Sequence, residues 1–213
     1  MANCPDFDIA FREQFGELLR WRRDVRRFLP DSVPSALLET VLASVAHAPS
    51  VGNSQPWRFV RVASSSRRQG LLNSFRRAND EALAGYRGER AAHYARLKLS
   101  GLAEAPIVLA VFTDEATNQG HGLGRQTMPE TLSYSTVAAV HTLWLVARCH
   151  GLGVGWVSII EPDSVRTLLE VPSAWSLTAL LCLGWPVEDH VDPELERAGW
   201  QERSRSLPVL IHR

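Results

Sequence analysis

The stretch HAPSVGNSQPWRF, residues 47–59, separates an apolar segment of helical spacing from a segment in which apolar and polar residues alternate. It combines small residues and two prolines with the amides Asn53 and Gln55. A loop of this composition can present backbone N–H groups and fixed amides to the polar edge of a heteroaromatic ring. A plain turn is the alternative, although a plain turn seldom needs so many restricted and amide residues together. The stretch therefore predicts a ligand-binding loop between a helix and a strand.

Two helices are predicted on the N-terminal side of this loop. Apolar residues fall at helical spacing over residues 11–21, and a basic run follows, so a first helix should end near residue 22. A second helix should have Asp31 or Ser32 as its N-cap and Pro34 in its first turn. Its buried stripe should consist of Leu37, Leu38, Val41, Leu42 and Val45.

Strands and further helices are predicted on the C-terminal side. Residues 57–63 (WRFVRVA) alternate in the manner of a half-exposed strand, and residues 106–114 (PIVLAVFTD) form the near-continuous apolar run of an interior strand. Between them, the charged residues 66–103 should form two helices broken around residues 85–88. Residues 115–128 are a glycine-rich loop.

The C-terminal half adds one strongly apolar helix and two more strands. Residues 133–149 (SYSTVAAVHTLWLVARC) are apolar nearly all round, which is typical of a helix buried in a core or an interface. Residues 153–160 and 176–187 are predicted as interior strands, separated by a helix over residues 162–171. The tail, residues 187–213, is polar and lacks a core pattern of its own, so we expect it to pack on a partner subunit.

Composition places the chain among ordinary globular proteins of one domain, covering residues 1–213. Of its residues 45% are hydrophobic, and 23 Lys and Arg balance 23 Asp and Glu, so no overall field recruits nucleic acid or an anionic membrane. No secretory signal and no apolar stretch of roughly 20 residues is evident, which predicts a soluble, cytoplasmic protein. Cys4, Cys149 and Cys182 are widely spaced, which predicts reduced thiols and no metal site.

The segment RWRRDVRRF, residues 20–28, places a dense group of arginines around one acid, Asp24. Guanidinium groups offer planar forks of donors that stay charged, so such a cluster suits a phosphate. A solvated basic face or a nucleic-acid patch would have the same composition. The arginines are Arg20, Arg22, Arg23, Arg26 and Arg27.

Together the two segments resemble the nitroreductase-like flavin family. Its pattern is Arg-Arg-Ser-x-Arg followed by Pro-Ser-x-x-Asn-x-Gln-Pro-Trp, and this chain has RRDVR at residues 22–26 and PSVGNSQPW at residues 49–57. The resemblance covers about residues 21–186. It implies an α+β fold with an antiparallel-dominated central sheet flanked by helices, and a homodimer with flavin mononucleotide (FMN) at the subunit interface.

Asp24 departs from this pattern, because the wider family has a serine there. A carboxylate near an anionic ligand costs Coulomb energy unless it is paired or has a chemical task. An ion pair with Arg23 or Arg26 is one explanation. The other is a role in catalysis, because RRDVR, APSVGNSQPW, LKLSGLAEAP, PETLSYSTVAAVHTLWLVAR and GLGVGWVSI together resemble one subgroup, the aerobic 5,6-dimethylbenzimidazole synthases.

That resemblance implies that reduced FMN is the substrate. With O2 it would be fragmented to 5,6-dimethylbenzimidazole, the lower ligand of cobalamin, and erythrose 4-phosphate. NAD(P)H would enter only through a separate flavin reductase that supplies the reduced FMN. The alternative is an NAD(P)H-dependent FMN nitroreductase or quinone reductase, which would keep its flavin bound.

The resemblance also implies roles for single residues. Asp24 would be a catalytic base for ribityl hydroxyls, and Ser158 would act near the flavin ring. A hydroxyl satisfied by the neighbouring strand is the structural alternative for Ser158. Arg203 and Arg205 in the tail could supply further phosphate contacts. The FMN-binding residues would be Arg22, Arg23, Asp24, Val25, Arg26, Ser50, Asn53, Leu99 and Ser158.

Overall fold

The computed structural model describes residues 5–204 and 210–213, and its centre is a four-stranded antiparallel sheet. The strands are β1 (Trp57–Arg61), β2 (Ile107–Asp114), β3 (Gly153–Val157) and β4 (Trp175–Gly184). Their order is β1-β2-β4-β3, and each neighbouring pair runs antiparallel. The predicted α+β class with an antiparallel sheet is therefore confirmed.

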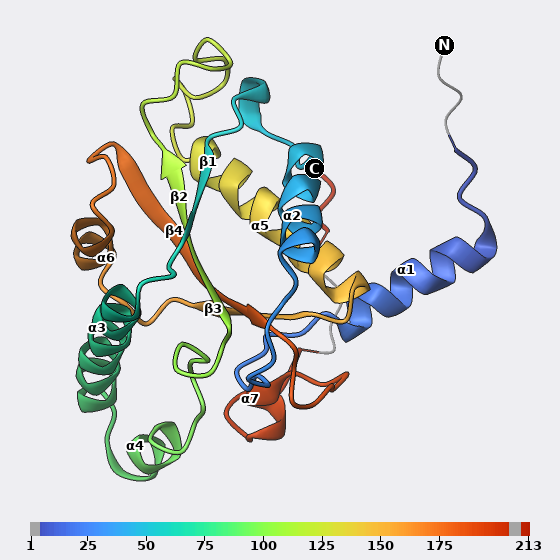
Figure 1. Cartoon of the computed structure of the whole chain (residues 1–213). Helices are drawn as coiled ribbons and strands as arrows, with labels where there is room; N and C mark the ends of the chain where they lie inside the picture. Colours follow the sequence, from blue (N-terminus) through green and yellow to red (C-terminus); the bar gives the residue numbers. More distant parts are fainter. Residues whose placement is uncertain (1–4, 205–209) are drawn as a thin grey trace.

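Helices pack on both faces of this sheet (Figure 1). α2 and α5 cover one face, and α3 and α6 cover the other (Figure 1). The two predicted helices around the break at residues 85–88 are α3 and α4. The helices are α1 (Ile9–Trp21), α2 (Ser35–Ala43), α3 (Ser65–Ala84), α4 (Gly88–Tyr94), α5 (Thr131–Cys149), α6 (Pro162–Leu169) and α7 (Glu194–Arg197), with 3₁₀ turns η1 (Ser44–His47) and η2 (Val51–Asn53).

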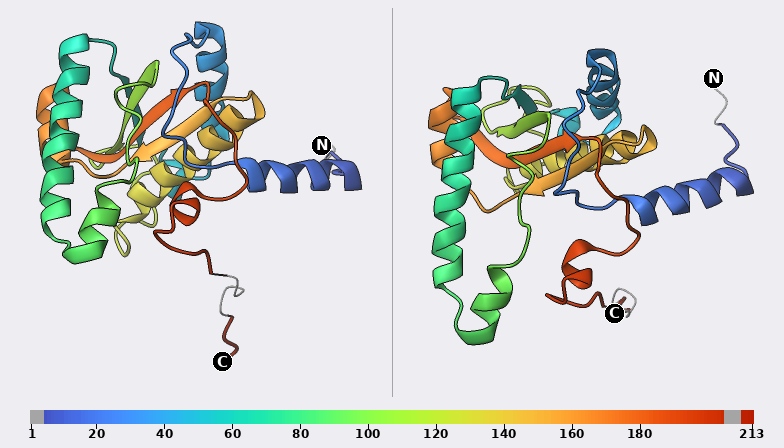
Figure 2. Two further views of the ribbon diagram at one scale, coloured as in Figure 1. Left: turned by 90° about the horizontal axis from the view of Figure 1, so that it is seen from below. Right: turned by 60° about the horizontal axis from the view of Figure 1, so that its bottom comes forward.

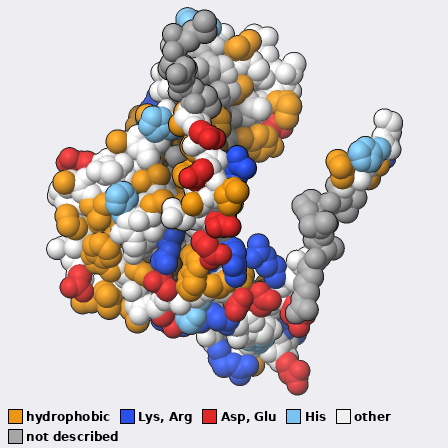
Figure 3. Space-filling model, turned by 90° about the vertical axis from the view of Figure 1, so that its right-hand side faces the viewer, with side chains coloured by type: hydrophobic (Ala, Val, Ile, Leu, Met, Phe, Trp, Pro, Cys, Tyr) orange, Lys and Arg blue, Asp and Glu red, His pale blue; other side chains and the backbone are white. Residues whose placement is uncertain are grey.

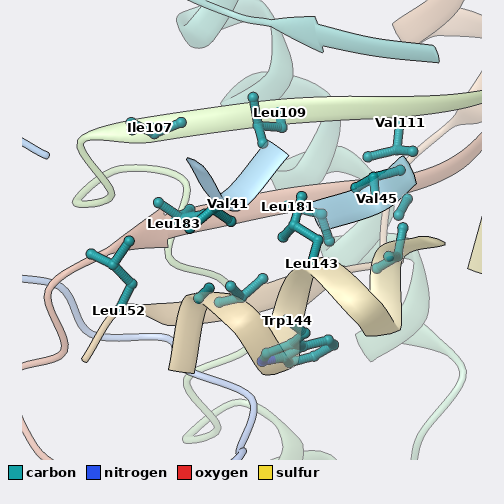
Figure 4. Close-up of a cluster of buried hydrophobic side chains, with 14 of the residues drawn as sticks. Val41, Val45, Ile107, Leu109, Val111, Leu143, Trp144, Leu152, Leu181 and Leu183 are labelled. Carbon is teal, nitrogen blue, oxygen red and sulfur yellow. The ribbon is translucent and has the colours of Figure 1, made fainter. Parts of the chain in front are cut away.

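The larger core lies between the sheet and the pair α2 and α5 (Figure 4). Leu143 and Val140 of α5 are fully buried there, as the apolar pattern of that helix predicted. β2 is buried along nearly its whole length, because helices cover the sheet on both sides. The predicted α2 stripe also faces this core, with Val41 fully buried.

Two predicted details are wrong. α2 starts at Ser35 with Pro34 in the N-cap position, and no side chain of Asp31 or Ser32 caps it. The Pro34 carbonyl accepts from the backbone N–H groups of Leu37 and Leu38. β3 is an edge strand of the four-stranded sheet rather than an interior one. Its apolar pattern arises because both faces of the strand are covered, with Val154 in the core on the α5 side and Val157 in the core on the α6 side.

Two glycines of β3 allow the N-terminal segment to approach closely. A Cβ at Gly155 would lie 2.1 Å from the carbonyl oxygen of Val25, and one at Gly153 would lie 2.8 Å from the Val25 side chain. The backbone N–H of Val25 donates to the carbonyl of Val154 at 3.0 Å. The sheet edge therefore fixes where residues 24 and 25 lie.

α1 extends away from the rest of the molecule (Figures 1 and 2). None of its residues is buried, and its apolar side chains include the exposed Phe11, Phe15 and Leu19. Among the described residues, no helix has both the length and the apolar character needed to cross a membrane.

We predict that Gly155→Ala lowers the free energy of unfolding by about 1–3 kcal/mol, because the added methyl group meets backbone that cannot rotate away. Gly16→Ala is the matched control, since a Cβ at Gly16 meets nothing within 4 Å and Gly16 lies inside α1. That change should stabilise the protein by about 0.5–1 kcal/mol. Urea unfolding of both variants measures the difference. Equal stability of the two variants would contradict the close approach at β3.

Candidate functional site

The site is built on the extended segment between α1 and α2. Asp24 forms a parallel bridge with Val154 of β3, so the segment continues the sheet for a short distance. Alternate residues of an extended chain point to the same side. Asp24 and Arg26 therefore face each other, and the Arg26 Nε donates to the Asp24 Oδ2 at 2.7 Å.

Asp24 is a partly buried carboxylate with partners on both oxygens. Its Oδ1 accepts from the backbone N–H of Trp156 at 2.8 Å, and its side chain is 30% exposed. Burial raises the pKa of Asp24 above its ordinary value, although Arg26 and the Trp156 N–H oppose the rise. Of the two ion pairs suggested by the sequence, the pair with Arg26 forms and the pair with Arg23 does not.

Arg22 and Arg23 carry the positive charge of the site. The Arg22 guanidinium lies over the Trp144 ring at 4.9 Å from its centre, and the described residues offer that guanidinium no hydrogen-bond acceptor. The Arg23 Nε donates to the carbonyl of Val191, which lies in the C-terminal segment. Burial and the nearby charge of Arg203 lower the pKa of both arginines. Asp24 and Asp192 oppose this lowering for Arg22 and Arg23 respectively, so the positive charge of the two side chains is only partly compensated.

Two carboxylates near the cluster pair with arginines other than Arg22 and Arg23. Arg27 lies 2.6 Å from Glu194, and Arg148 lies 2.5 Å from Asp189. In the described part of the chain no salt bridge includes Arg22 or Arg23. Figure 3 shows Lys and Arg side chains intermixed with Asp and Glu side chains on one face of the molecule.

A cavity of about 400 Å³ opens between the arginine segment and the C-terminal segment. That volume is within the range of small-molecule sites. The cavity brings together five sequence-predicted residues, four from the arginine segment and Arg203 from the tail. Its walls are Arg22, Arg23, Asp24, Arg26, Pro193, Glu194, Leu195, Glu196, Gln201, Glu202 and Arg203. Val25 lies in a smaller adjoining cavity, and Arg205 lies outside the described residues.

The remaining predicted residues lie elsewhere in the single chain. Asn53 ends the η2 turn and Ser50 is its N-cap residue. The turn packs on the glycine-rich loop, where the Gln119 Nε2 donates to the Asn53 carbonyl at 2.9 Å. Leu99 lines a separate cavity of about 190 Å³ beside α3. Ser158 follows directly after β3 and is exposed.

The sequence did not indicate several residues of the site. Trp144 lies under Arg22, yet in the sequence it is one apolar residue of a wholly apolar helix. Glu194 and Leu195 line the cavity from a tail with no periodic pattern. Nothing in the described ranges, 5–204 and 210–213, groups three or more His, Cys, Asp or Glu side chains as a metal site.

The nitroreductase family model matches residues 19–185. The chain is 55% identical over 210 residues to the 5,6-dimethylbenzimidazole synthase of Rhodospirillum rubrum, with 99% of each chain covered. It is 48% identical to a 5,6-dimethylbenzimidazole synthase of Rhodobacter capsulatus, with 92% of this chain and 95% of the relative covered.

A solved structure shares the fold. The crystal structure of oxidised iodotyrosine deiodinase bound to FMN and 3-iodo-L-tyrosine matches 93% of this chain and 98% of its own, with a TM-score of 0.73 and 24% identity. The arginine segment and the η2 turn both fall inside the region that the family model matches. The chain therefore belongs to the nitroreductase family, within the group of its relatives named 5,6-dimethylbenzimidazole synthase.

Proposed function

We propose that this protein is a 5,6-dimethylbenzimidazole synthase that fragments reduced FMN with O2 to 5,6-dimethylbenzimidazole and erythrose 4-phosphate. The relatives that are 55% and 48% identical over nearly the whole chain carry that name. The observation that supports it most directly is the position of Asp24, a partly buried carboxylate on a cavity wall that also holds Arg22 and Arg23, neither of which has a salt bridge within the described residues.

The arginines fit the phosphate of FMN. Arg22 and Arg23 are partly buried and lack carboxylate partners in the described chain, so an anion would relieve their mutual repulsion. Arg26 is engaged by Asp24 and by the Lys98 carbonyl, which it meets at 2.8 Å. We therefore assign phosphate binding mainly to Arg22 and Arg23, and the orientation of Asp24 to Arg26.

The reduced flavin supplies the electrons for O2 and the ring that becomes the product. The protein must place the ribityl chain and accept protons from its hydroxyls. Asp24 is suited to this task because each carboxylate oxygen has a second lone pair beyond the one used by Arg26 or Trp156. Burial raises its pKa, which makes it a stronger base than an exposed aspartate. Ser158, Ser50, Asn53 and Leu99 are proposed to contact the flavin.

A homodimer is part of this proposal. α1 has no buried residue, and α5 exposes the apolar side chains Tyr134 and Val137 on its outer face. Ser50 and Asn53 lie outside the arginine cavity of their own chain, as expected if two subunits share each flavin site. Light scattering would show two chains per particle, and a monomer that binds FMN would contradict this arrangement.

The cell must deliver the substrate already reduced. We propose that a separate flavin reductase supplies the reduced FMN and that the protein works in the cytoplasm. The decisive test is aerobic incubation with FMN, NADH and such a reductase, followed by chromatography for 5,6-dimethylbenzimidazole. If FMN instead stays intact and bound while NADH is consumed without the reductase, the protein is an NAD(P)H-dependent nitroreductase and the proposal is wrong.

We predict that Arg22→Ala weakens FMN binding about 10- to 100-fold, because a charge-assisted contact to phosphate is lost. The turnover number at saturating reduced FMN should change little, since the same contact persists through the reaction. Arg23→Ala should behave alike. Flavin fluorescence titration measures the affinity.

Arg77→Ala is the matched control, because Arg77 lies on the exposed surface of α3. Its FMN affinity should equal that of the wild type. Arg26→Ala should differ from the Arg22, Arg23 and Arg77 variants, because it removes the side chain that orients Asp24. It should lower the turnover number as well as the affinity for FMN. An Arg22→Ala variant with wild-type affinity would remove the phosphate assignment.

We predict that Asp24→Asn lowers the rate of flavin fragmentation at least about 100-fold while reduced FMN still binds, because a proton acceptor supplies about 10²- to 10⁴-fold in rate. An amide has only one acceptor oxygen, so it must turn a donor toward either Arg26 or the Trp156 N–H. Asp24→Ser is therefore a second variant that also lacks the carboxylate, since its hydroxyl can accept from the Trp156 N–H without presenting a donor to Arg26. Single-turnover product formation measures the fragmentation rate of both variants.

The pH dependence provides an independent check. A base acts only when ionised, and burial raises the pKa of Asp24 above 3.8. The fragmentation rate should therefore increase as the pH rises through that raised pKa and then become constant, and Asp24→Asn should abolish this dependence. If Asp24→Asn fragments flavin at nearly the wild-type rate, Asp24 is structural and Ser158 becomes the leading candidate.

A further inference from the structure

Trp200 lies in a cluster of aromatic side chains that joins the C-terminal segment to α4. Its ring meets Tyr86 edge-on at 5.5 Å between centres, and it meets His93 at 5.6 Å and Tyr94 at 5.9 Å. The Arg90 guanidinium lies over the same ring at 5.5 Å. Aromatic pairs and cation–π contacts of this kind stabilise a contact beyond the area that they bury. Trp200 is therefore an anchor point for the segment that carries it.

Polar contacts hold the same junction. His93 Nε2 lies 2.7 Å from the carbonyl oxygen of Ala198, two residues before Trp200. Gly199, between them, has a φ of +72°, which turns the chain so that the Trp200 ring faces α4. The Tyr94 hydroxyl donates to Asn79 of α3 at 3.0 Å, so α4 is itself held on the long helix. The anchor thus rests on a packed part of the fold.

The start of the segment is held at the arginine motif. Val187 donates its N–H to the carbonyl of Arg27 at 3.1 Å, and the Arg23 side chain donates to the carbonyl of Val191. Residues 187–200 therefore run from the arginine motif to α4, with the 400 Å³ cavity along the way. Arg203 follows Trp200 by three residues, and an extended chain spans at most about 3.6 Å per residue. Anchoring Trp200 thus keeps the backbone of Arg203 within about 11 Å of that of Trp200, and Arg203 lines the cavity.

Arg203 has no other restraint visible in the described chain. It is exposed, and none of the ion pairs among the described residues includes it. Its charge lowers the pKa of both Arg22 and Arg23, so the three guanidinium groups repel one another. This repulsion opposes the position of Arg203 beside the two arginines, although Glu194, Glu196 and Glu202 also line the cavity. The contacts next to Arg203 in the chain are the Trp200 aromatic cluster and a long hydrogen bond of 3.5 Å from the Gln201 N–H to the Leu195 carbonyl.

We propose that Trp200 is a positioning residue that holds Arg203 beside Arg22 and Arg23, so that three guanidinium groups bind the phosphate of reduced FMN. Trp200 itself lines no part of the 400 Å³ cavity and acts through Arg203. The inference rests on the proposed function, because it takes FMN as the ligand. It adds a residue that contacts neither flavin nor reacting atoms.

The test compares FMN with riboflavin, which has the same ring and ribityl chain but no phosphate. Trp200→Ala and Arg203→Ala should each weaken FMN binding about tenfold, as expected for one charge-assisted contact. Riboflavin binding should change less than about twofold in both variants. The double variant should bind FMN no more weakly than either single variant, since both changes remove one shared contact. Trp200→Phe should keep most of the affinity, and the KM for reduced FMN should rise in Trp200→Ala while kcat stays constant.

Each other outcome overturns a stated part of the argument. If Trp200→Ala weakens FMN and riboflavin binding equally, Trp200 only stabilises the fold, which thermal unfolding of the same variant would reveal. If Arg203→Ala loses affinity and Trp200→Ala does not, Arg203 needs no positioning. If additive losses appear in the double variant, the two residues act separately. A wild-type protein that binds FMN no better than riboflavin would refute the phosphate site of the proposed function itself, and the inference with it.

Discussion

The site depends on one backbone contact, the approach of residues 24 and 25 to the outer edge of β3. Gly153 and Gly155 leave no side chain between the two stretches of chain, and Val25 donates its N–H to Val154. The contact gives Asp24 its Trp156 partner, turns Arg26 toward Asp24, and leaves Arg22 over Trp144. A side chain at Gly155 would displace the carboxylate and the arginines together. The contact of residues 24 and 25 with β3 therefore determines both the local packing and the positions of the side chains that form the site.

The distribution of charge around this contact is uneven although the chain as a whole is neutral. Acidic side chains of the C-terminal segment pair with Arg27 and Arg148, which lie at the margin. On the cavity wall, Arg22 has a ring contact and Arg23 has backbone contacts, and neither has a salt bridge within the described residues, although Glu194, Glu196 and Glu202 line the same wall. An anion bound there would compensate the two guanidinium groups that have no ion pair. Net composition could not reveal this separation.

The sequence predicted α5 and β2 from nearly continuous apolar composition, because both are buried on more than one side. It predicted α3 and α4 from a charged segment with a break at residues 85–88. The prediction of β3 as an interior strand was wrong, since the side chains of an edge strand that is covered on both faces have the same apolar composition. The arginine cluster was evident because its members are adjacent in sequence. The cavity wall formed by Glu194 and Leu195 was not evident from the sequence, because only tertiary contacts bring these tail residues to the site.

The two walls of the cavity come from opposite parts of the chain, and Arg23 and Val191 are 168 residues apart. A ribosome releases the arginine segment early and the α7 segment only near the end of synthesis, so a growing chain has one wall without the other. Contacts of such long sequence separation also form late in folding, after the local helices. The nascent protein consequently exposes its guanidinium groups to any cellular polyanion before it possesses a closed cavity. The protein can therefore discriminate its ligand from other anions only after the α7 segment has been synthesised and has closed the cavity.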